Sequence, residues 1–128
     1  MSVELNHTIV HASDREASAR FLSEILGLAA PRAFGPFLVV QTANGVSLDF
    51  IADRGPIAHQ HYAFLVSEAD FDAIFARIAA RGMTYWADPA RRRENVINTN
   101  DGGRGCYFLE PSGHFLEILT RPYGSGEA

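Results

Sequence analysis

Two stretches decide the fold: NHTIVHASDRE at residues 6–16 and QHYAFLVSEAD at residues 60–70. Each begins with a run that contains β-branched or aromatic residues, which predicts a strand. In each, a serine then precedes an acidic residue by three positions, which is typical of the start of a helix. His7 and His61 are 54 positions apart (61 − 7 = 54), and the two serines have the same offset (67 − 13 = 54). The chain is therefore predicted to contain one structural unit twice.

The same order of elements follows each stretch. Ser13 and Ser67 are the expected N-caps of two helices, in which apolar side chains recur at helical spacing as far as Gly27 and Gly82. Further strands are expected near residues 32–34, 37–42 and 46–52 in the first half, and near 84–87, 104–110 and 114–121 in the second. The order βαβββ is therefore predicted twice.

This repeat predicts a single α+β domain over residues 1–128. Its parts are a first module at about 3–52, a linker at 53–59, a second module at about 60–121 and a C-terminal tail at 122–128. The polar segment 88–103 is a long loop, and loops of that length in small domains are usually functional or mobile. A two-layer α+β sandwich without internal symmetry is the alternative.

The composition excludes several classes of protein. The chain has 15 acidic and 11 basic residues and a formal net charge of −4, which argues against nucleic-acid binding through a basic face. The single cysteine, Cys106, cannot form an intrachain disulfide, and its apolar neighbours predict a packed thiol. No apolar window reaches the ~20 residues of a membrane span. The first residues have no signal-peptide pattern, so we expect a cytoplasmic protein.

Four polar side chains fall on strand faces that should be buried. Strand side chains alternate between faces, and if the apolar neighbours pack under the helices, the other face carries His7, Asp49, His61 and Glu117. An isolated buried carboxylate costs several kcal/mol unless it has a partner. A divalent cation supplies one, and two histidines with one carboxylate are the ligand set of non-haem iron oxygenases.

Taken singly, these residues have simpler explanations. Asp49 suits a solvent-facing strand position equally well, and Glu117 could pair with an arginine such as Arg104. The remaining histidines are assigned to surface or turn positions: His11, His59 and His114. His59 is the main alternative to His61 as a ligand, because it has the same strand parity. The recurrence of the pattern in both repeats is what favours a metal site.

With these features the sequence resembles the vicinal oxygen chelate superfamily, which contains glyoxalase I, extradiol dioxygenases, fosfomycin-resistance enzymes and bleomycin-binding proteins. The stretches that carry the resemblance are NHTIVHASD, HYAFLVSEADFDAIFARIAARG and GRGCYFLEPSGHFLEILTRP, and it covers about residues 3–121. It implies two βαβββ modules that form a half-open curved mixed sheet, a cup around a metal, with the helices on the outer face. The runs TYWADP, NDGGRG and EILTRPYGSG look like the ChaP-like branch, named for a ring-opening oxygenase of aromatic polyketide biosynthesis.

The resemblance implies a ligand set and a cofactor. His7, His61 and Glu117 match the metal ligands of the superfamily, and Asp49 falls where glyoxalase I carries a further glutamate, which makes it a candidate fourth ligand. Fe(II) or Mn(II) is the favoured ion, with Zn(II) and Ni(II) as alternatives. Bleomycin-binding members lack the metal residues, which argues against that branch. We also expect a homodimer, as is usual in the superfamily.

The favoured function is a metal-dependent dioxygenase of the extradiol, ring-opening type. Its substrate would be a small aromatic molecule, catechol- or polyketide-like, that chelates the metal through vicinal oxygens and reacts with dioxygen. Tyr107 and Tyr123 are candidate catalytic residues that could hydrogen-bond the substrate, although packing in the core is favoured for Tyr107. A solvated loop face is favoured for the three arginines at 91–93 over a lid that attracts an anionic or phenolate substrate.

Two other functions stay open. One is a glyoxalase I-like isomerase or lyase, with Asp49 as a ligand and Glu117 as the base. The other is a drug- or metabolite-binding protein without catalytic turnover.

Overall fold

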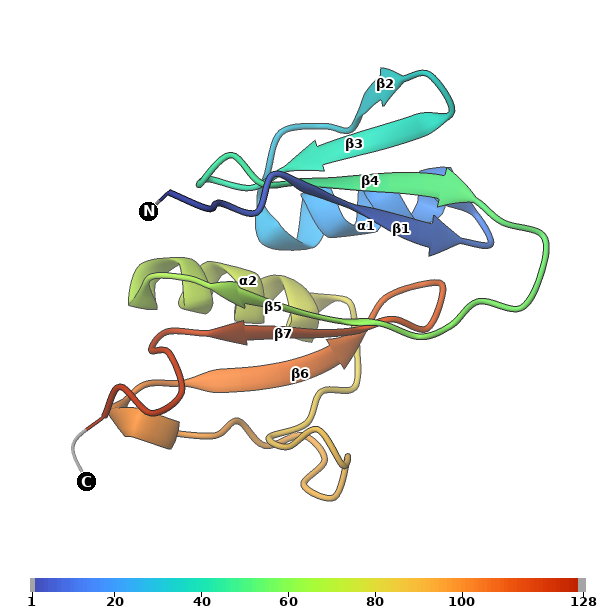
Figure 1. The fold of residues 1–128 in the computed structure, drawn as a ribbon. Coiled ribbons are helices and arrows are strands. Elements are labelled where there is room, and N and C mark those ends of the chain that lie inside the picture. The colour runs from blue at the N-terminus through green and yellow to red at the C-terminus, as the bar shows by residue number, and fades with distance from the viewer. Residues whose placement is uncertain (1, 127–128) are drawn as a thin grey trace. The chain divides into compact units, whose positions relative to one another are not determined.

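The chain divides into two compact units, and the computed structural model describes residues 2–126. Unit 1 comprises the residues up to His59 together with Glu110–Ser112, and unit 2 comprises Gln60–Leu109 together with the residues from Gly113 onward. Each unit is one mixed sheet with one helix against it, as Figure 1 shows for each.

Unit 1 contains a four-stranded sheet in the order β1-β4-β3-β2. Its strands are β1 (His7–Ala12), β2 (Arg32–Phe34), β3 (Phe37–Gln41) and β4 (Ser47–Ala52). The pair β1–β4 is parallel and the other pairs are antiparallel. Because β1 and β4 are parallel, the chain must cross over between them, and helix α1 (Arg15–Leu26) lies in that crossover.

Helix α1 begins one residue later than predicted. Its N-cap is Asp14, whose side chain accepts a hydrogen bond from the Ala17 N–H at 3.0 Å. The prediction of Ser13 as N-cap is wrong, because Asp caps a helix as well as Ser does, and the Ser13 N–H instead donates to the Ser112 hydroxyl at 3.1 Å. The helix ends where expected, at Gly27 in the left-handed conformation (φ 71°).

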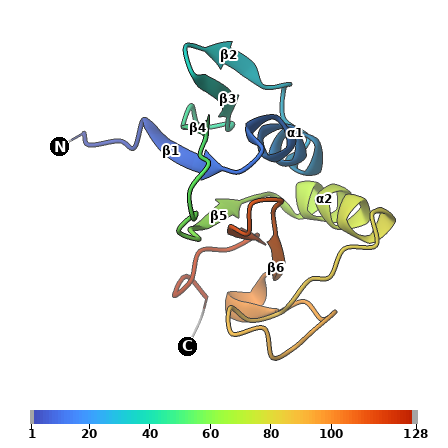
Figure 2. The same ribbon diagram turned by 90° about the vertical axis from the view of Figure 1, so that its right-hand side faces the viewer.

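The core of unit 1 lies between α1 and one face of the sheet, and Figure 2 shows the helix along that face. Alternate strand residues point toward the helix and are buried, among them Val10, Val40, Leu48 and Phe50. The residues between them, including His7 and Ile9, lie on the opposite, more exposed face.

Unit 2 contains a three-stranded sheet in the order β5-β7-β6, built from β5 (His61–Leu65), β6 (Gly105–Leu109) and β7 (Phe115–Leu119). The pair β5–β7 is parallel and β6–β7 is antiparallel. Helix α2 (Glu68–Ala80) starts at the predicted N-cap Ser67, whose hydroxyl accepts from the Asp70 N–H at 3.1 Å. The buried apolar side chains of the helix and of the sheet include Phe71, Ile74, Ile78, Phe108, Leu116 and Ile118.

The predicted strand at 84–87 is wrong, because only Trp86 pairs. Its backbone exchanges two hydrogen bonds with Tyr107, at 2.9 and 2.8 Å. Two residues later the Asp88 carboxylate accepts the N–H groups of Arg92 and Arg93, which turns the chain away from the sheet. Pro89 also lacks the N–H that a continued ladder would need.

The predicted α+β class is confirmed: both sheets are mixed and open, and neither closes into a barrel. Within residues 2–126, no helix has the length and the hydropathy needed to cross a membrane.

Candidate metal centre

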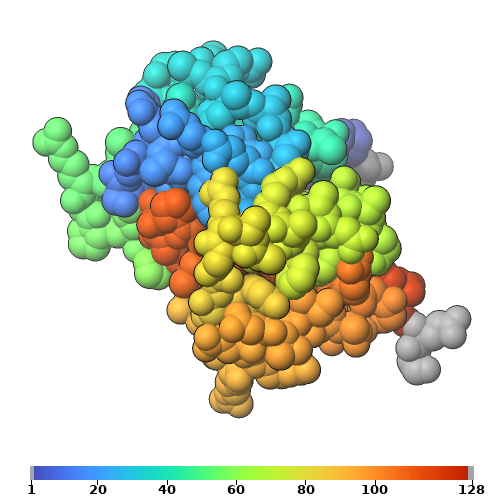
Figure 3. Space-filling view, turned by 180° about the vertical axis from the view of Figure 1, so that it is seen from behind, coloured from blue at the N-terminus to red at the C-terminus, as the bar shows by residue number. Residues whose placement is uncertain are grey.

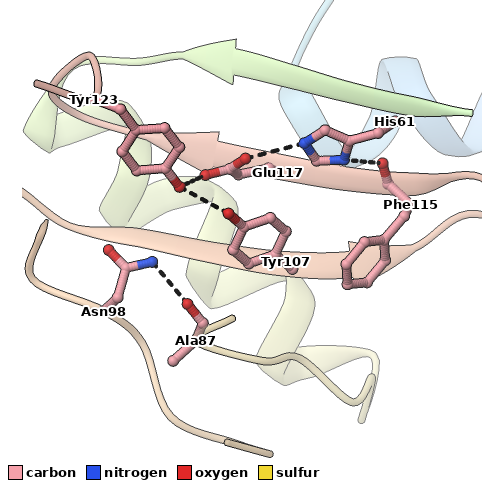
Figure 4. Close-up of polar contacts among 7 residues, drawn as sticks. All are labelled: His61, Ala87, Asn98, Tyr107, Phe115, Glu117 and Tyr123. Atoms are coloured by element: carbon pink, nitrogen blue, oxygen red, sulfur yellow. Dashed lines mark hydrogen bonds and ion pairs between the residues drawn. The ribbon is translucent and has the colours of Figure 1, made fainter. Parts of the chain in front are cut away.

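His61 on β5 and Glu117 on β7 form the core of the candidate site. The parallel register pairs His61 with Phe115, so Glu117 lies two residues further along the neighbouring strand on the same face. Leu116 and Ile118 are buried on the other face, which directs the Glu117 side chain away from α2. His61 Nε2 lies 3.1 Å from Glu117 Oε1, as Figure 4 shows. Glu117 is 1% exposed, whereas the His61 side chain is 46% exposed.

A backbone carbonyl of β7 determines which ring nitrogen of His61 carries the hydrogen. His61 Nδ1 lies 2.8 Å from the Phe115 carbonyl oxygen, which can only accept a hydrogen bond, so Nδ1 carries a hydrogen. In the neutral ring the lone pair is then on Nε2, directed at the Glu117 carboxylate. Two acceptors at that distance repel each other, so a proton or a cation belongs between them.

The pair fits a divalent cation by two observations. Two donors held about 2.1 Å from one ion at a right angle are about 3.0 Å apart, which agrees with the 3.1 Å separation of Nε2 and Oε1. A metal-bound histidine almost always donates its other ring N–H to a carbonyl or carboxylate, as His61 does to Phe115.

The second oxygen of Glu117 is held by two tyrosines. The Tyr123 hydroxyl donates to Glu117 Oε2, and the Tyr107 hydroxyl lies 2.8 Å from that of Tyr123. Burial is the main cause that raises the pKa of both phenols, and the hydrogen bond to Glu117 adds to the rise for Tyr123. Both phenols are therefore neutral at pH 7. Because Tyr123 donates its proton to Glu117, Tyr107 donates in turn to Tyr123.

A carboxylate that the sequence did not single out anchors the segment that carries Tyr123. Asp101 Oδ2 accepts the Gly124 N–H at 3.2 Å, and Asp101 Oδ1 accepts the Gly126 N–H at 3.1 Å. A Cβ atom at Gly126 would lie 2.5 Å from Asp101 Cα, so the two segments are in close contact. The only signal in the sequence is an aspartate in the run NDGG, which also suits an ordinary turn.

His7 and Asp49 lie in unit 1 with the same strand relation. His7 pairs with Ser47 across the parallel β1–β4 ladder, so Asp49 lies two residues further along, as Glu117 does relative to His61. His7 Nδ1 is 2.8 Å from Asn6 Oδ1. Asp49 Oδ1 is buried and has no hydrogen-bond partner among residues 2–126.

The structure thus joins two of the four predicted ligands in unit 2 and places the other two on one sheet face of unit 1. Within either unit taken alone, no three His, Cys, Asp or Glu side chains of residues 2–126 gather closely enough to hold a metal ion.

The sequence also assigns positions or partners to His114, Arg104 and Cys106. Of the surface or turn position expected for His114, the surface is wrong, because its ring is 1% exposed and Nδ1 accepts the Gln60 N–H at 3.0 Å; the residue directly follows the turn at 111–113. Arg104 pairs with Glu68 and Asp72, both at 2.8 Å, rather than with Glu117. The thiol of Cys106 is packed as predicted, and burial, followed by the charge of Glu117, raises its pKa to about 12.

Aromatic side chains surround His61. We call Trp86, Tyr107 and Phe115 the aromatic cluster. The rings of Tyr107 and Phe115 stack with centroids 5.3 Å apart, and Trp86 lies 5.9 Å from Phe115. The His61 ring lies 5.7 Å from Tyr107 and 6.1 Å from Phe115. Trp86 and Phe115 are partly exposed, and apolar rings beside two ligand atoms suit an aromatic molecule.

The profile of the glyoxalase/bleomycin resistance protein/dioxygenase superfamily matches residues 4–118. The chain belongs to this superfamily. The predicted resemblance is confirmed, and members of the superfamily bind divalent metals such as manganese, iron and zinc.

The relatives within the superfamily are enzymes of more than one kind. Glutathione transferase FosA of Serratia marcescens is 32% identical over 124 residues, which cover 92% of this chain and 81% of FosA. The structure of oxidase ChaP-H1 is 67% identical, with a TM-score of 0.94 over 96% of this chain and 99% of that one. The structure of oxidase ChaP-H2 is 64% identical, with a TM-score of 0.96 over 99% of this chain and 100% of that one. These relatives support an enzyme and the predicted ChaP-like branch.

Proposed function

We propose that the protein is a metal-dependent oxygenase that opens or modifies the ring of an aromatic substrate chelated through two vicinal oxygens. The observation that carries this proposal is the His61–Glu117 pair beside the aromatic cluster, with Nδ1 of His61 bound to a backbone carbonyl. The identity of 67% to an oxidase, ChaP-H1, supports an oxidative reaction over the other chemistries of the superfamily.

The proposed ligands are His61, Glu117 and, from unit 1 of the same chain or of a second copy in a homodimer, His7. Asp49 is a weaker fourth candidate, because its side chain is one methylene shorter than glutamate. Histidine and carboxylate donors suit Fe(II) or Mn(II), with Zn(II) and Ni(II) as alternatives. The bound ion would act as a Lewis acid and lower the pKa of a substrate hydroxyl.

The protein itself would orient the ligand atoms and the substrate. The Tyr123 hydroxyl, which Tyr107 supports, engages Oε2 of Glu117, and this leaves Oε1, beside His61 Nε2, to bind the ion. The aromatic cluster would hold the substrate ring in one plane beside the two ligand atoms. Holding the reactants together in this way removes much of the entropic cost of their encounter.

Metal titration and oxygen uptake test this proposal. Calorimetric titration of the full chain with Fe(II) or Mn(II) under anaerobic conditions should show binding that His61→Ala and Glu117→Ala abolish. His59→Ala is the matched control, because it removes an exposed imidazole two residues away from the pair. The loaded enzyme should consume oxygen with catechols or polycyclic hydroquinones and incorporate both atoms of labelled dioxygen. Absence of metal binding in the wild type would overturn the proposal.

A thiol transferase is the second candidate, favoured by the 32% identity to glutathione transferase FosA. The same metal-loaded preparation distinguishes the two reactions. Consumption of glutathione with an electrophilic substrate, with no oxygen uptake across the aromatic panel, would replace the oxygenase by the transferase.

A further inference from the structure

The guanidinium of Arg91 lies over two rings of the aromatic cluster, Phe115 and Trp86. Its guanidinium carbon is 4.9 Å from the centroid of Phe115 and 5.6 Å from that of Trp86. Among residues 2–126, no hydrogen bond or ion pair engages this guanidinium. Attraction to the ring faces holds the cation but uses none of its N–H donors.

Arg104 in the same unit is an arginine whose charge is paired within the protein, and it provides a comparison for Arg91. It also lies over a ring, 4.4 Å from the centroid of Phe71. Unlike Arg91, it pairs with Glu68 and Asp72, and these carboxylates raise its pKa further. The charge of Arg104 is therefore neutralised within the protein, whereas that of Arg91 is available to a ligand.

The loop that carries Arg91 is tied down at several points, and Figure 3 shows the segment that contains it (amber to orange) at the surface of unit 2. The Ala87 N–H donates to the Arg93 carbonyl at 3.0 Å, and the Asn95 N–H donates to the Tyr85 carbonyl at 2.7 Å. Asn98 Nδ2 donates to the Ala87 carbonyl at 2.9 Å, as Figure 4 shows.

This ordered loop holds Arg91 in an unfavourable backbone conformation. Its φ is 59°, in the left-handed region that side chains other than glycine rarely adopt. Such outliers persist only where the surrounding structure imposes them, and they occur often at ligand-binding positions. The cation of this residue is the one that lies over Phe115 and Trp86.

The ring under Arg91 is also next to the candidate ligands. Phe115 lies 6.1 Å from the His61 ring, so one aromatic substrate can contact both. Trp86 further lines a recess of about 470 Å³ together with Met83, Thr84, Glu94 and Leu109. That volume is in the range of pockets that hold small organic ligands.

We propose that Arg91 selects the substrate class by binding an anionic oxygen, a carboxylate or a phenolate, of an aromatic molecule whose ring lies beside Trp86 and Phe115. The planar guanidinium presents paired N–H donors that match such an oxyanion. This inference rests on the proposed function for the reaction, but the binding itself needs no metal.

The test uses Trp86, the only tryptophan of the chain, whose indole N–H gives a single resonance in a ¹H–¹⁵N spectrum. The metal-free full chain is titrated with 2-naphthoate and with its neutral counterpart 2-naphthamide, neither of which has vicinal oxygens for a metal. The wild type should shift the Trp86 resonance and bind the anion about tenfold more tightly, since a charge-assisted pair is stronger than a neutral one.

Arg91→Gln should remove this preference and leave the affinity for the amide unchanged, and Arg91→Lys should restore part of it. Arg93→Gln is the matched control, because it removes the same charge from the same loop, and the Arg93 side chain has no ring or polar contact within residues 2–126. It should weaken naphthoate binding less than twofold.

Three results would overturn the proposal: no shift of Trp86 with either compound, equal losses in Arg91→Gln and Arg93→Gln, or equal losses of anion and amide binding in Arg91→Gln. The last would show a distorted loop. Metal titration of the wild type is separate from this experiment. If the wild type binds no metal but still prefers the anion, the proposed oxygenase function is wrong and the proposed role of Arg91 stands.

Discussion

Asp49 on β4 and Glu117 on β7 occupy equivalent places in the two units, yet their carboxylates have different surroundings. Each lies two residues beyond the strand partner of a histidine on the neighbouring parallel strand. Glu117 Oε2 accepts a hydrogen bond from Tyr123 and Oε1 faces His61 Nε2 at 3.1 Å, whereas Asp49 Oδ1 is buried with no hydrogen bond among residues 2–126. A repeated strand pattern thus places a carboxylate in both units, but only one unit adds the groups that orient it.

The largest expected effect is a difference between these two carboxylates in metal retention. Glu117→Ala should reduce metal affinity by more than about 100-fold, beyond the range of an indirect effect, whereas Asp49→Ala should reduce it by less than about tenfold. Metal analysis after dialysis and calorimetric titration measure both. Equal and complete loss in the two variants would contradict the comparison and establish four protein ligands.

Removal of the hydroxyl that holds Glu117 should have the next largest effect. Tyr123→Phe frees Oε2, so we expect metal affinity to fall by about 10- to 100-fold. The Co(II)-loaded variant should also change its visible spectrum if the carboxylate then binds through both oxygens. Tyr62→Phe is the control, since Tyr62 alternates with His61 and lies on the other face of β5. An unchanged affinity and spectrum in Tyr123→Phe would mean that Glu117 needs no such support.

The anchor of the tail should matter less than the tyrosine that it positions. Asp101→Ala removes the acceptors of the Gly124 and Gly126 N–H groups, so these amides should exchange faster with solvent. Metal affinity should fall only a few-fold, because the Tyr123 hydroxyl can still reach Glu117 part of the time. Hydrogen-exchange measurements and metal titration check this, and a loss as large as that of Tyr123→Phe would show that the anchor is essential.

The smallest effect concerns pH. The pKa of Cys106 is raised to about 12 in the folded chain by burial and, second, by Glu117, from an ordinary value of 9.0. The protonated thiol is therefore favoured by folding, and its stabilisation is complete below pH 9 and is lost as the pH rises from 9 toward 12. At pH 10 the loss should be about 1.4 kcal/mol.

Urea unfolding between pH 8 and 10.5 measures this loss, with Cys106→Ala as the control that should lack the thiol's share of it. Glu117→Gln should make the decline slightly less steep, and Asp49→Asn should leave it unchanged. Identical slopes for the wild type and Cys106→Ala would mean that the thiol does not contribute.

Several features of the site follow from local patterns in the sequence. Alternation along β5 and β7 is enough to predict that His61 and Glu117 face away from the buried Leu116 and Ile118. The offset of 54 residues predicts the repeat, because each unit needs its own helix to cover one face of its sheet.

Other features depend on where the chain returns after a turn. His114 is buried against the Gln60 backbone, and Asp101 binds the segment around Tyr123, through contacts between residues far apart in the sequence. The predicted strand at 84–87 is reduced to a single paired residue, Trp86, because Asp88 turns the chain.

The sequence by itself therefore determined the order of the helices and strands apart from the strand expected at 84–87, the faces of the strands and the residue types available for a metal. Only the tertiary structure decided which oxygen of Glu117 is held by Tyr123, which imidazole nitrogen of His61 faces the other oxygen, and which arginine lies over Trp86 and Phe115. The physical reason is that strand alternation is a local property of the backbone, whereas hydrogen-bond partners depend on the register of strands and the paths of loops.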